Sequence, residues 1–295
     1  MKPLIPAPAL TTGATVATVA ASSAIPDNER LLQGLAVLES WGLICLDSDV
    51  VGRHWGYLAG SDADRRSDLL TPESAALLAC ARGGWGAARL LESDLPWRPG
   101  WLLGFSDVTA LLWSRLAAGY GGGIHGPLLT TLAAEPDWSQ ERLRQLLFGE
   151  PVSDLNGVGL GGGQSTGPLV VANLTVATHL LGSGHVPDLK GAVLILEDVG
   201  EAPYRIDRML THWRLCGALK GLAGIGFGQF LDCCDEDRPQ DWCFSLDQVL
   251  KERTDDLGIP RVLNLPIGHV AGNAALPMGR LACLDGDTGQ LSLLA

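Results

Sequence analysis

The sequence predicts an α/β fold with two domains: an N-terminal, Rossmann-like domain on a mostly parallel sheet, and a smaller C-terminal α/β domain with a mixed sheet. Three observations predict it. Strand-like and helix-like segments alternate in the first half, which is the order of a parallel sheet covered by helices. The length of 295 residues fits about two domains. A stretch rich in Gly, Ser and Pro over residues 151–168 separates two blocks of such segments.

The first domain is expected over residues 1–150. Its Val-, Ala- and Thr-rich residues 14–20 predict a strand, and leucines at helical spacing after Asp27 or Asn28 predict a capped helix. The segments expected next are a strand at 43–46, a helix at 62–70, an apolar run at 75–81, a helix at 85–91, a strand at 101–105, a helix at 107–118 and a polar helix from Glu135 to Gly149.

The second domain is expected over residues 169–295, with residues 151–168 as a loop or linker before it. The elements expected there are a helix after Asn173, a strand at 192–196, a helix at 203–219, a strand at 225–230 and a helix at 245–253.

Composition excludes several classes of protein. With 33 acidic and 21 basic residues the net charge is −12, which argues against a nucleic-acid partner. No apolar stretch reaches about 18 residues, so neither a membrane span nor a membrane partner is expected, and the cytoplasm is the predicted location. Seven cysteines, an odd number, do not suggest a disulfide framework. Free thiols explain Cys233, Cys234 and Cys243 better than a metal site does, and no cofactor is expected.

The segment from Gly104 to Asp107 has the features of a nucleophile elbow. It lies between an apolar strand and a helix, so Ser106 would project its hydroxyl from the sheet, and the glycine two residues earlier relieves crowding in the turn. The second glycine of the usual Gly-x-Ser-x-Gly pattern is replaced by Val108. A simple Ser-Asp helix cap explains the same residues, so the segment alone leaves both interpretations open.

A serine nucleophile needs a base and a carboxylate that orients the base. Of the six histidines, His269 lies in a glycine-flanked loop after an apolar stretch, and His125 lies in a second such loop. Glu197 is the first polar residue after the apolar strand at 192–196, and α/β proteins place their sites at the carboxyl ends of parallel strands. The alternative for Glu197 is the start of a surface turn.

Seven short motifs follow one another along the chain: Tyr57-Leu58-Ala59-Gly60, Arg82-Gly83-Gly84-Trp85-Gly86, Gly104-Phe105-Ser106-Asp107, His125-Gly126-Pro127, Asn173-Leu174-Thr175, Leu196-Glu197-Asp198-Val199-Gly200-Glu201 with Tyr204-Arg205, and Gly268-His269. In this order they resemble the LD-carboxypeptidases, serine peptidases also called murein tetrapeptide carboxypeptidases, whose relatives include the microcin C self-immunity peptidases. The chain departs from the family pattern at Trp85, where the family usually has Tyr, and at Ala172, where it usually has Gly.

This resemblance implies a Ser-His-Glu triad. Ser106 matches the nucleophile, His269 the base and Glu197 the orienting acid, while the backbone N–H groups of Asp107 and Gly84 match the oxyanion hole. Since the nucleophile precedes the linker and its partners follow it, the expected active site lies in a cleft between the domains. The family also commonly forms homodimers, so a homodimer is expected.

The family's substrate is a murein tetrapeptide, from which the enzyme releases the terminal D-alanine during peptidoglycan recycling. Arg82 is a candidate for the substrate carboxylate, with a strand-end ion pair as the alternative. Asn173 would hydrogen-bond the substrate or hold its own loop. Two other readings stay open: the same triad acting on a peptidyl- or aminoacyl-nucleotide, and a non-catalytic two-domain ligand-binding protein. A glutamine amidotransferase would need cysteine in place of Ser106.

Overall fold

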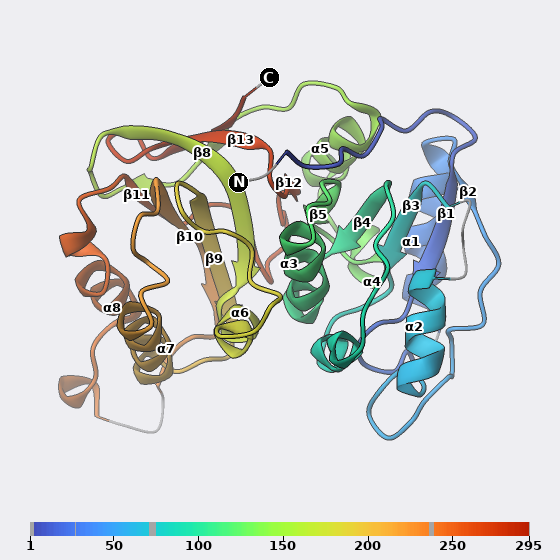
Figure 1. Ribbon diagram of the computed structural model, residues 1–295, viewed down its shortest axis with the longest axis horizontal. Helices are drawn as coiled ribbons and strands as arrows, with labels where there is room; N and C mark the ends of the chain where they lie inside the picture. Colours follow the sequence, from blue (N-terminus) through green and yellow to red (C-terminus); the bar gives the residue numbers. More distant parts are fainter. Residues whose placement is uncertain (1–2, 27, 71–74, 236–238, 295) are drawn as a thin grey trace. The chain divides into compact units, whose positions relative to one another are not determined.

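A computed structural model describes residues 3–26, 28–70, 75–235 and 239–294. The chain divides into two compact units. The N-terminal unit consists of Lys2–Ser153 and Ala271–Gly279, and the C-terminal unit of Asp154–Val270 and Arg280–Ala295. Figure 1 shows the elements of each, which we describe separately.

The N-terminal unit contains a six-stranded sheet in the order β12-β5-β4-β3-β1-β2. Five strands are parallel, and the edge strand β12 is antiparallel to β5. This confirms the mostly parallel sheet. The strands are β1 (Thr15–Val19), β2 (Ile44–Cys45), β3 (Leu77–Cys80), β4 (Trp101–Gly104), β5 (Gly123–His125) and β12 (Leu276–Pro277).

The helices of this unit largely match the predicted segments. They are α1 (Glu29–Ser40), α2 (Asp62–Leu70), α3 (Thr109–Ala117), α4 (Leu129–Leu132) and α5 (Asp137–Phe148), with the 3₁₀ turns η1 (Ala87–Glu92) and η2 (Ser106–Val108). Asn28 is the N-cap of α1 without a side-chain cap bond, and Asp27 lies outside the described residues. Helix α1 approaches α4 so closely that a Cβ on Gly34 would lie 1.9 Å from the carbonyl oxygen of Leu129.

The C-terminal unit contains an eight-stranded mixed sheet in the order β6-β14-β13-β8-β9-β10-β11-β7. The four strands from β8 to β11 in this order are parallel, and the flanking strands are antiparallel. The strands are β6 (Leu155–Asn156), β7 (Val158–Gly159), β8 (Gln164–Asn173), β9 (Val193–Val199), β10 (Gly224–Leu231), β11 (Arg261–Leu263), β13 (Leu281–Asp285) and β14 (Gln290–Leu293).

Three helices of this unit lie side by side (Figure 1), namely α6 (Leu174–Leu180), α7 (Pro203–Leu215) and α8 (Leu246–Glu252). The short turns η3 (Gln240–Trp242) and η4 (Asp255–Leu257) flank α8. The indole N–H of Trp213, a fully buried side chain, donates to the Thr178 hydroxyl at 2.8 Å and joins α7 to α6.

The expected loop over residues 151–168 is wrong for much of its length, because β6, β7 and the start of β8 lie within it. Several of its glycines mark close backbone contacts. A Cβ on Gly157 would lie 2.2 Å from the Leu263 carbonyl oxygen, and one on Gly167 would lie 2.0 Å from the Gly191 carbonyl oxygen. Glycine is the residue that permits such approaches inside a sheet, so a high glycine content here does not indicate a linker.

Residues 271–279 differ from the single domain boundary that the sequence suggested, since they belong to the N-terminal unit. Polar side chains around α5 hold this segment by its backbone. The carboxylate of Glu135 accepts the N–H groups of Gly272 and Asn273 at 2.7 and 3.0 Å, and Arg142 donates to the carbonyl of Ala275 at 2.9 Å. These contacts between residues about 135 positions apart left no local signal in the sequence.

Candidate active site

Ser106 has the backbone conformation of a nucleophile elbow. It follows β4 directly after Phe105 and has φ +62°, in the left-handed region that side chains other than glycine's rarely adopt. Such a strained residue costs about 1–3 kcal/mol and persists where the surrounding structure enforces it, often at active sites. A simple helix cap would have extended backbone instead, so the conformation favours the elbow over the cap.

The glycine two residues before Ser106 is required by packing. A Cβ on Gly104 would lie 2.7 Å from Cγ1 of Val108 and 3.1 Å from Cβ of Cys80. Val108 is fully buried and fills this space. The bulky residue at the position of the usual second glycine is therefore accommodated by the missing side chain of Gly104.

The loop before η1 lies against the nucleophile. A Cβ on Gly83 would lie 3.0 Å from the Ser106 Cβ. Gly84 has φ +112°, and a Cβ on it would clash with the Ser23 Oγ at 2.0 Å. Asp107 is the second residue of η2, where backbone N–H groups lack intrahelical acceptors. The structure thus places both proposed oxyanion donors, Gly84 and Asp107, in segments adjoining Ser106.

The side chain of Asp107 fastens this loop, a role that the sequence did not suggest. Its Oδ2 accepts the Ser22 hydroxyl at 2.6 Å and the Ala87 N–H at 2.8 Å. Burial raises the pKa of Asp107, and these two bonds together with the nearby Arg65 partly offset the rise. Arg65 is itself fully buried and donates to the carbonyl of Gly86 at 2.9 Å. One carboxylate therefore connects the end of β1 with the glycine loop.

We expect Asp107→Ala to destabilise the protein by about 2–5 kcal/mol, because it leaves both the Ser22 hydroxyl and the Ala87 N–H buried without an acceptor. Ser22→Ala is the matched control, since it removes one of these bonds and is expected to cost about 1 kcal/mol. Urea denaturation of both variants measures the difference. Equal stability of the two variants would contradict the fastening role of Asp107.

Glu197 and His269 form a buried acid–base pair in the C-terminal unit. Glu197 lies near the carboxyl end of β9 with no exposed side chain, and its Oε2 lies 2.8 Å from Nδ1 of His269, whose side chain is 20% exposed. Burial raises the pKa of Glu197, while the bond to His269 opposes the rise. A carboxylate on Nδ1 leaves Nε2 as the nitrogen that can exchange a proton with a substrate. Glu197 therefore does not begin a surface turn.

Asn173 holds its own loop, the second of its two predicted roles. It is buried at the N-cap of α6, where its Oδ1 accepts the Val176 N–H at 3.1 Å. Its Nδ2 donates to Asp198 at 3.0 Å, and Asp198 also accepts both the N–H and the hydroxyl of Thr175. Asn173 further helps to lower the pKa of Glu197 against the effect of burial. Asp198, which neighbours the predicted acid in the sequence, thus anchors α6 beside Glu197.

Arg82 follows β3 and donates one Nη to the carbonyl oxygen of Ala24 at 3.0 Å. Its predicted alternative, a strand-end ion pair, does not occur with any residue that the structure describes.

His125, the second candidate base, lies on β5 in the N-terminal unit. Its side chain is fully buried, and its ring centroid lies 5.7 Å from that of Phe105. A base must reach a substrate, so the partly exposed His269 suits the role and the enclosed His125 does not.

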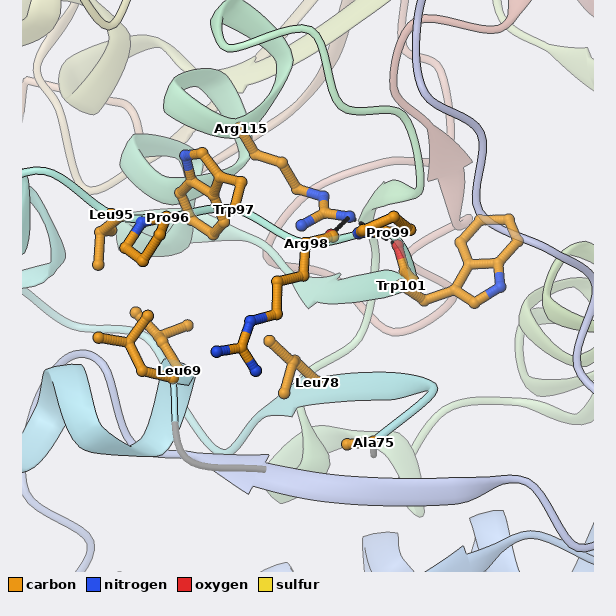
Figure 2. A pocket seen from close by; sticks show the side chains of 12 residues that line it. Leu69, Ala75, Leu78, Leu95, Pro96, Trp97, Arg98, Pro99, Trp101 and Arg115 are labelled. Carbon is orange, nitrogen blue, oxygen red and sulfur yellow. Dashed lines mark hydrogen bonds between the residues drawn. The ribbon is translucent and has the colours of Figure 1, made fainter. Parts of the chain in front are cut away.

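A cavity in the N-terminal unit lies at the amino ends of β3 and β4, where Ala75 and Trp101 are found (Figure 2). Arg115 on α3 borders it and donates to the carbonyl oxygens of Arg98 and Gly100 at 2.8 and 2.7 Å. Burial lowers the pKa of Arg115 to about 10. Ser106 follows the opposite, carboxyl end of β4, so this cavity is separate from the elbow.

Two further features bear on function. Over the described residues, no helix is long and apolar enough to cross a membrane. The same residues include no group of three or more His, Cys, Asp or Glu side chains placed to hold a metal ion.

The three clustered cysteines are free thiols in different surroundings. Cys233 is buried, Cys243 is partly buried and Cys234 is exposed.

Comparison with known proteins places the chain in a family. The profile of the LD-carboxypeptidase N-terminal domain matches residues 16–126, and that of the LD-carboxypeptidase C-terminal domain matches residues 166–284. The chain is 46% identical to a Synechocystis protein named "Putative carboxypeptidase", over 96% of this chain and 95% of that protein. It is 34% identical to the murein tetrapeptide carboxypeptidase of Pseudomonas aeruginosa, over 80% of this chain and 83% of that protein.

Solved structures agree with the fold. The crystal structure of muramoyltetrapeptide carboxypeptidase from Oxalobacter formigenes superposes with a TM-score of 0.82 at 26% identity, covering 95% of this chain and 97% of that one. The microcin C7 self-immunity protein MccF superposes with a TM-score of 0.85 at 21% identity, covering 99% of both chains, which shows a shared fold. The chain is a hydrolase that belongs to the LD-carboxypeptidase family.

Proposed function

We propose that this protein is a serine LD-carboxypeptidase that releases the terminal D-alanine of murein tetrapeptides through a triad of Ser106, His269 and Glu197. The observation that carries the proposal is the strained backbone of Ser106, with φ +62° directly after a parallel strand. The 2.8 Å contact between Nδ1 of His269 and the buried Glu197 supplies an oriented base.

In the proposed reaction, the Ser106 hydroxyl attacks the carbonyl carbon of the terminal peptide bond while Nε2 of His269 takes its proton. The resulting imidazolium, stabilised by Glu197, then protonates the leaving amine, and D-alanine departs. A water molecule, deprotonated by His269, hydrolyses the acyl-enzyme and restores the Ser106 hydroxyl.

The backbone N–H groups of Asp107 and Gly84 would stabilise the oxyanion of each tetrahedral intermediate. Losing one such donor typically raises the barrier by about 3–4 kcal/mol. Gly84 suits this role because its φ of +112° is costly for any residue with a Cβ, and its surface is exposed beside the elbow. The Asp107 side chain, by contrast, faces the interior and positions the loop.

The substrate assignment is supported by relatives. The protein from Pseudomonas aeruginosa is named for murein tetrapeptide, and a Bacillus subtilis relative 32% identical over 94% of this chain is named a probable murein peptide carboxypeptidase. A murein tetrapeptide is anionic and the chain has a net charge of −12, so binding requires a local cation. Arg82 is the proposed partner of the substrate carboxylate. The accompanying proposals are action in peptidoglycan recycling, a cytoplasmic location and a homodimeric state.

The test is hydrolysis of purified muropeptides by the full chain, with products identified by mass. We expect loss of one alanine from the tetrapeptide, and no loss from a tripeptide that lacks the terminal D-alanine. His269→Ala is expected to remove activity, whereas His185→Ala, a histidine on an exposed loop, is expected to keep it. Turnover of an aminoacyl-nucleotide analogue without release of D-alanine would overturn the substrate assignment while keeping the triad.

A further inference from the structure

Three large aromatic side chains are exposed near the glycine loop of the N-terminal unit. Trp55, Tyr57 and Trp85 are 52%, 63% and 56% exposed, and we call them the aromatic platform. The rings of Tyr57 and Trp85 meet edge to face, with centroids 6.0 Å apart and an interplanar angle of 71°. Exposed apolar groups that cluster in this way, rather than singly, mark surfaces that bind something.

The backbone holds the platform beside the proposed oxyanion hole. Trp85 directly follows Gly84, and its N–H donates to the Ser23 hydroxyl at 3.3 Å. The next residue, Ala24, donates its N–H to the carbonyl of Tyr57 at 3.1 Å. The segment at residues 23–24 therefore supports both the glycine loop and the turn that carries Trp55 and Tyr57. These two hydrogen bonds hold the backbone of Tyr57 and Trp85 on the same short segment.

The turn and its third ring are also fixed. Trp55 and Leu58 exchange backbone hydrogen bonds of 2.9 and 3.1 Å, which closes the turn. Arg89 lies over the ring of Trp55, with its guanidinium carbon 5.4 Å from the ring centroid, and Asp62 holds that guanidinium at 2.9 Å. Rigid aromatic rings lose little conformational entropy on binding, so this surface suits a ligand with flat apolar faces.

The chemistry of the proposed reaction decides which part of the substrate can reach the platform. The leaving group is a single D-alanine, which is too small to extend across three aromatic side chains. The acyl part is larger: three residues connect the scissile carbonyl to the sugar in a muramoyl peptide, and they span roughly 10 Å when extended. Trp85 directly follows Gly84, and the ring centroid of Tyr57 lies 6.0 Å from that of Trp85, so the acyl part is the part of the substrate that suits these rings.

We propose that the aromatic platform binds the muramoyl sugar of the substrate, through contact between the aromatic faces and the C–H groups of the sugar ring. This inference rests on the proposed murein-peptide function and deepens it. The chain's relatives at 32–34% identity carry murein names, which favours a sugar over a nucleobase as the occupant. The platform would make the enzyme prefer sugar-linked tetrapeptides to free ones.

The test compares kcat/KM for muramoyl tetrapeptide with that for the free tetrapeptide. We expect wild type to prefer the sugar-linked substrate by about tenfold, and Trp85→Ala and Tyr57→Ala to lower this preference to about twofold or less. Turnover of the free tetrapeptide should stay within about threefold of wild type in both variants. Trp85→Tyr keeps an aromatic face and should retain most of the preference, and Trp242→Ala, at a tryptophan 82% exposed in the other unit, should retain all of it.

The outcomes separate the two proposals. Equal turnover of both substrates by wild type, or a preference that survives Trp85→Ala with Tyr57→Ala, would overturn the sugar-binding role and leave the carboxypeptidase assignment standing. An equal loss on both substrates would also overturn it, because the rings would then act on the oxyanion loop. If an aminoacyl-nucleotide were turned over faster than the muramoyl tetrapeptide, and if this depended on Trp85 and Tyr57, the ligand of the platform would be a nucleobase and the sugar-binding role would be overturned. Failure to cleave either tetrapeptide would refute the proposed function itself.

Discussion

Ser106→Ala is expected to lower kcat by about 10⁴–10⁶-fold while the protein stays folded. Loss of a triad nucleophile leaves only the contribution of the oxyanion hole and of substrate binding. Alanine has the same Cβ as serine and therefore bears the same backbone strain at φ +62°, so the alanine variant should remain folded. Release of D-alanine from muropeptide, followed by mass over hours, measures the loss.

A second substitution at this position tests the elbow itself. Ser106→Gly should be as inactive as Ser106→Ala, yet about 1 kcal/mol more stable, because glycine adopts φ near +62° without a steric penalty. Ser40→Ala, at an exposed serine on α1, serves as the control that keeps activity. Activity retained in Ser106→Ala, or no stability gain from glycine, would contradict the nucleophile elbow.

Glu197→Gln is expected to lower kcat by about 10³–10⁴-fold. The amide cannot stabilise the imidazolium of His269, and it no longer selects the tautomer with the proton on Nδ1. The matched control is Glu201→Gln, at a partly exposed carboxylate on the same segment that pairs with Arg205. Glu201→Gln should change kcat by no more than about threefold.

Relative to wild type, Glu197→Gln should become more stable as the pH rises. Burial raises the pKa of Glu197, so the folded protein holds this proton more tightly than the unfolded chain does. The free energy of unfolding of wild type therefore falls as pH rises from the ordinary glutamate pKa through the raised one, and Glu197→Gln escapes this loss. Thermal unfolding of both proteins from pH 4 to pH 8 measures it. A difference in Tm that does not grow in favour of Glu197→Gln would contradict the raised pKa.

Much of the N-terminal unit was predictable because its signals are local. The apolar runs that became β1, β3 and β4 are bounded by polar or glycine residues, and the alternation with helices dictates parallel pairing. The elbow was visible as a strand, a glycine, a serine and a helix in succession. The φ of +62° at Ser106 distinguishes the nucleophile elbow from a simple helix cap, and the sequence does not reveal this angle.

Other features depend on residues that are distant in the sequence. The strands at 155–159 and 164–168 were predicted as loop, since their glycines serve contacts with residues 191 and 263 that no local pattern reveals. The short edge strand β12 joins the N-terminal sheet by pairing with β5, which is distant in the sequence, and Arg142 on α5 donates to the carbonyl of Ala275 just before it. Residues 271–279 likewise belong to the N-terminal unit through contacts that composition does not reveal.

The roles of the polar residues divide in the same way. Sequence alone determined the residue types at the elbow, the acid at the end of β9 and the glycine-flanked histidine, because each chemistry demands a side chain at a recognisable local position. Only the tertiary structure decided that Glu197 meets His269, that Asn173 donates to Asp198, and that Asp107 fastens the glycine loop. A hydrogen bond depends on the positions of two groups in space, and the fold brings together groups that the sequence separates by 72 residues in the first of these cases.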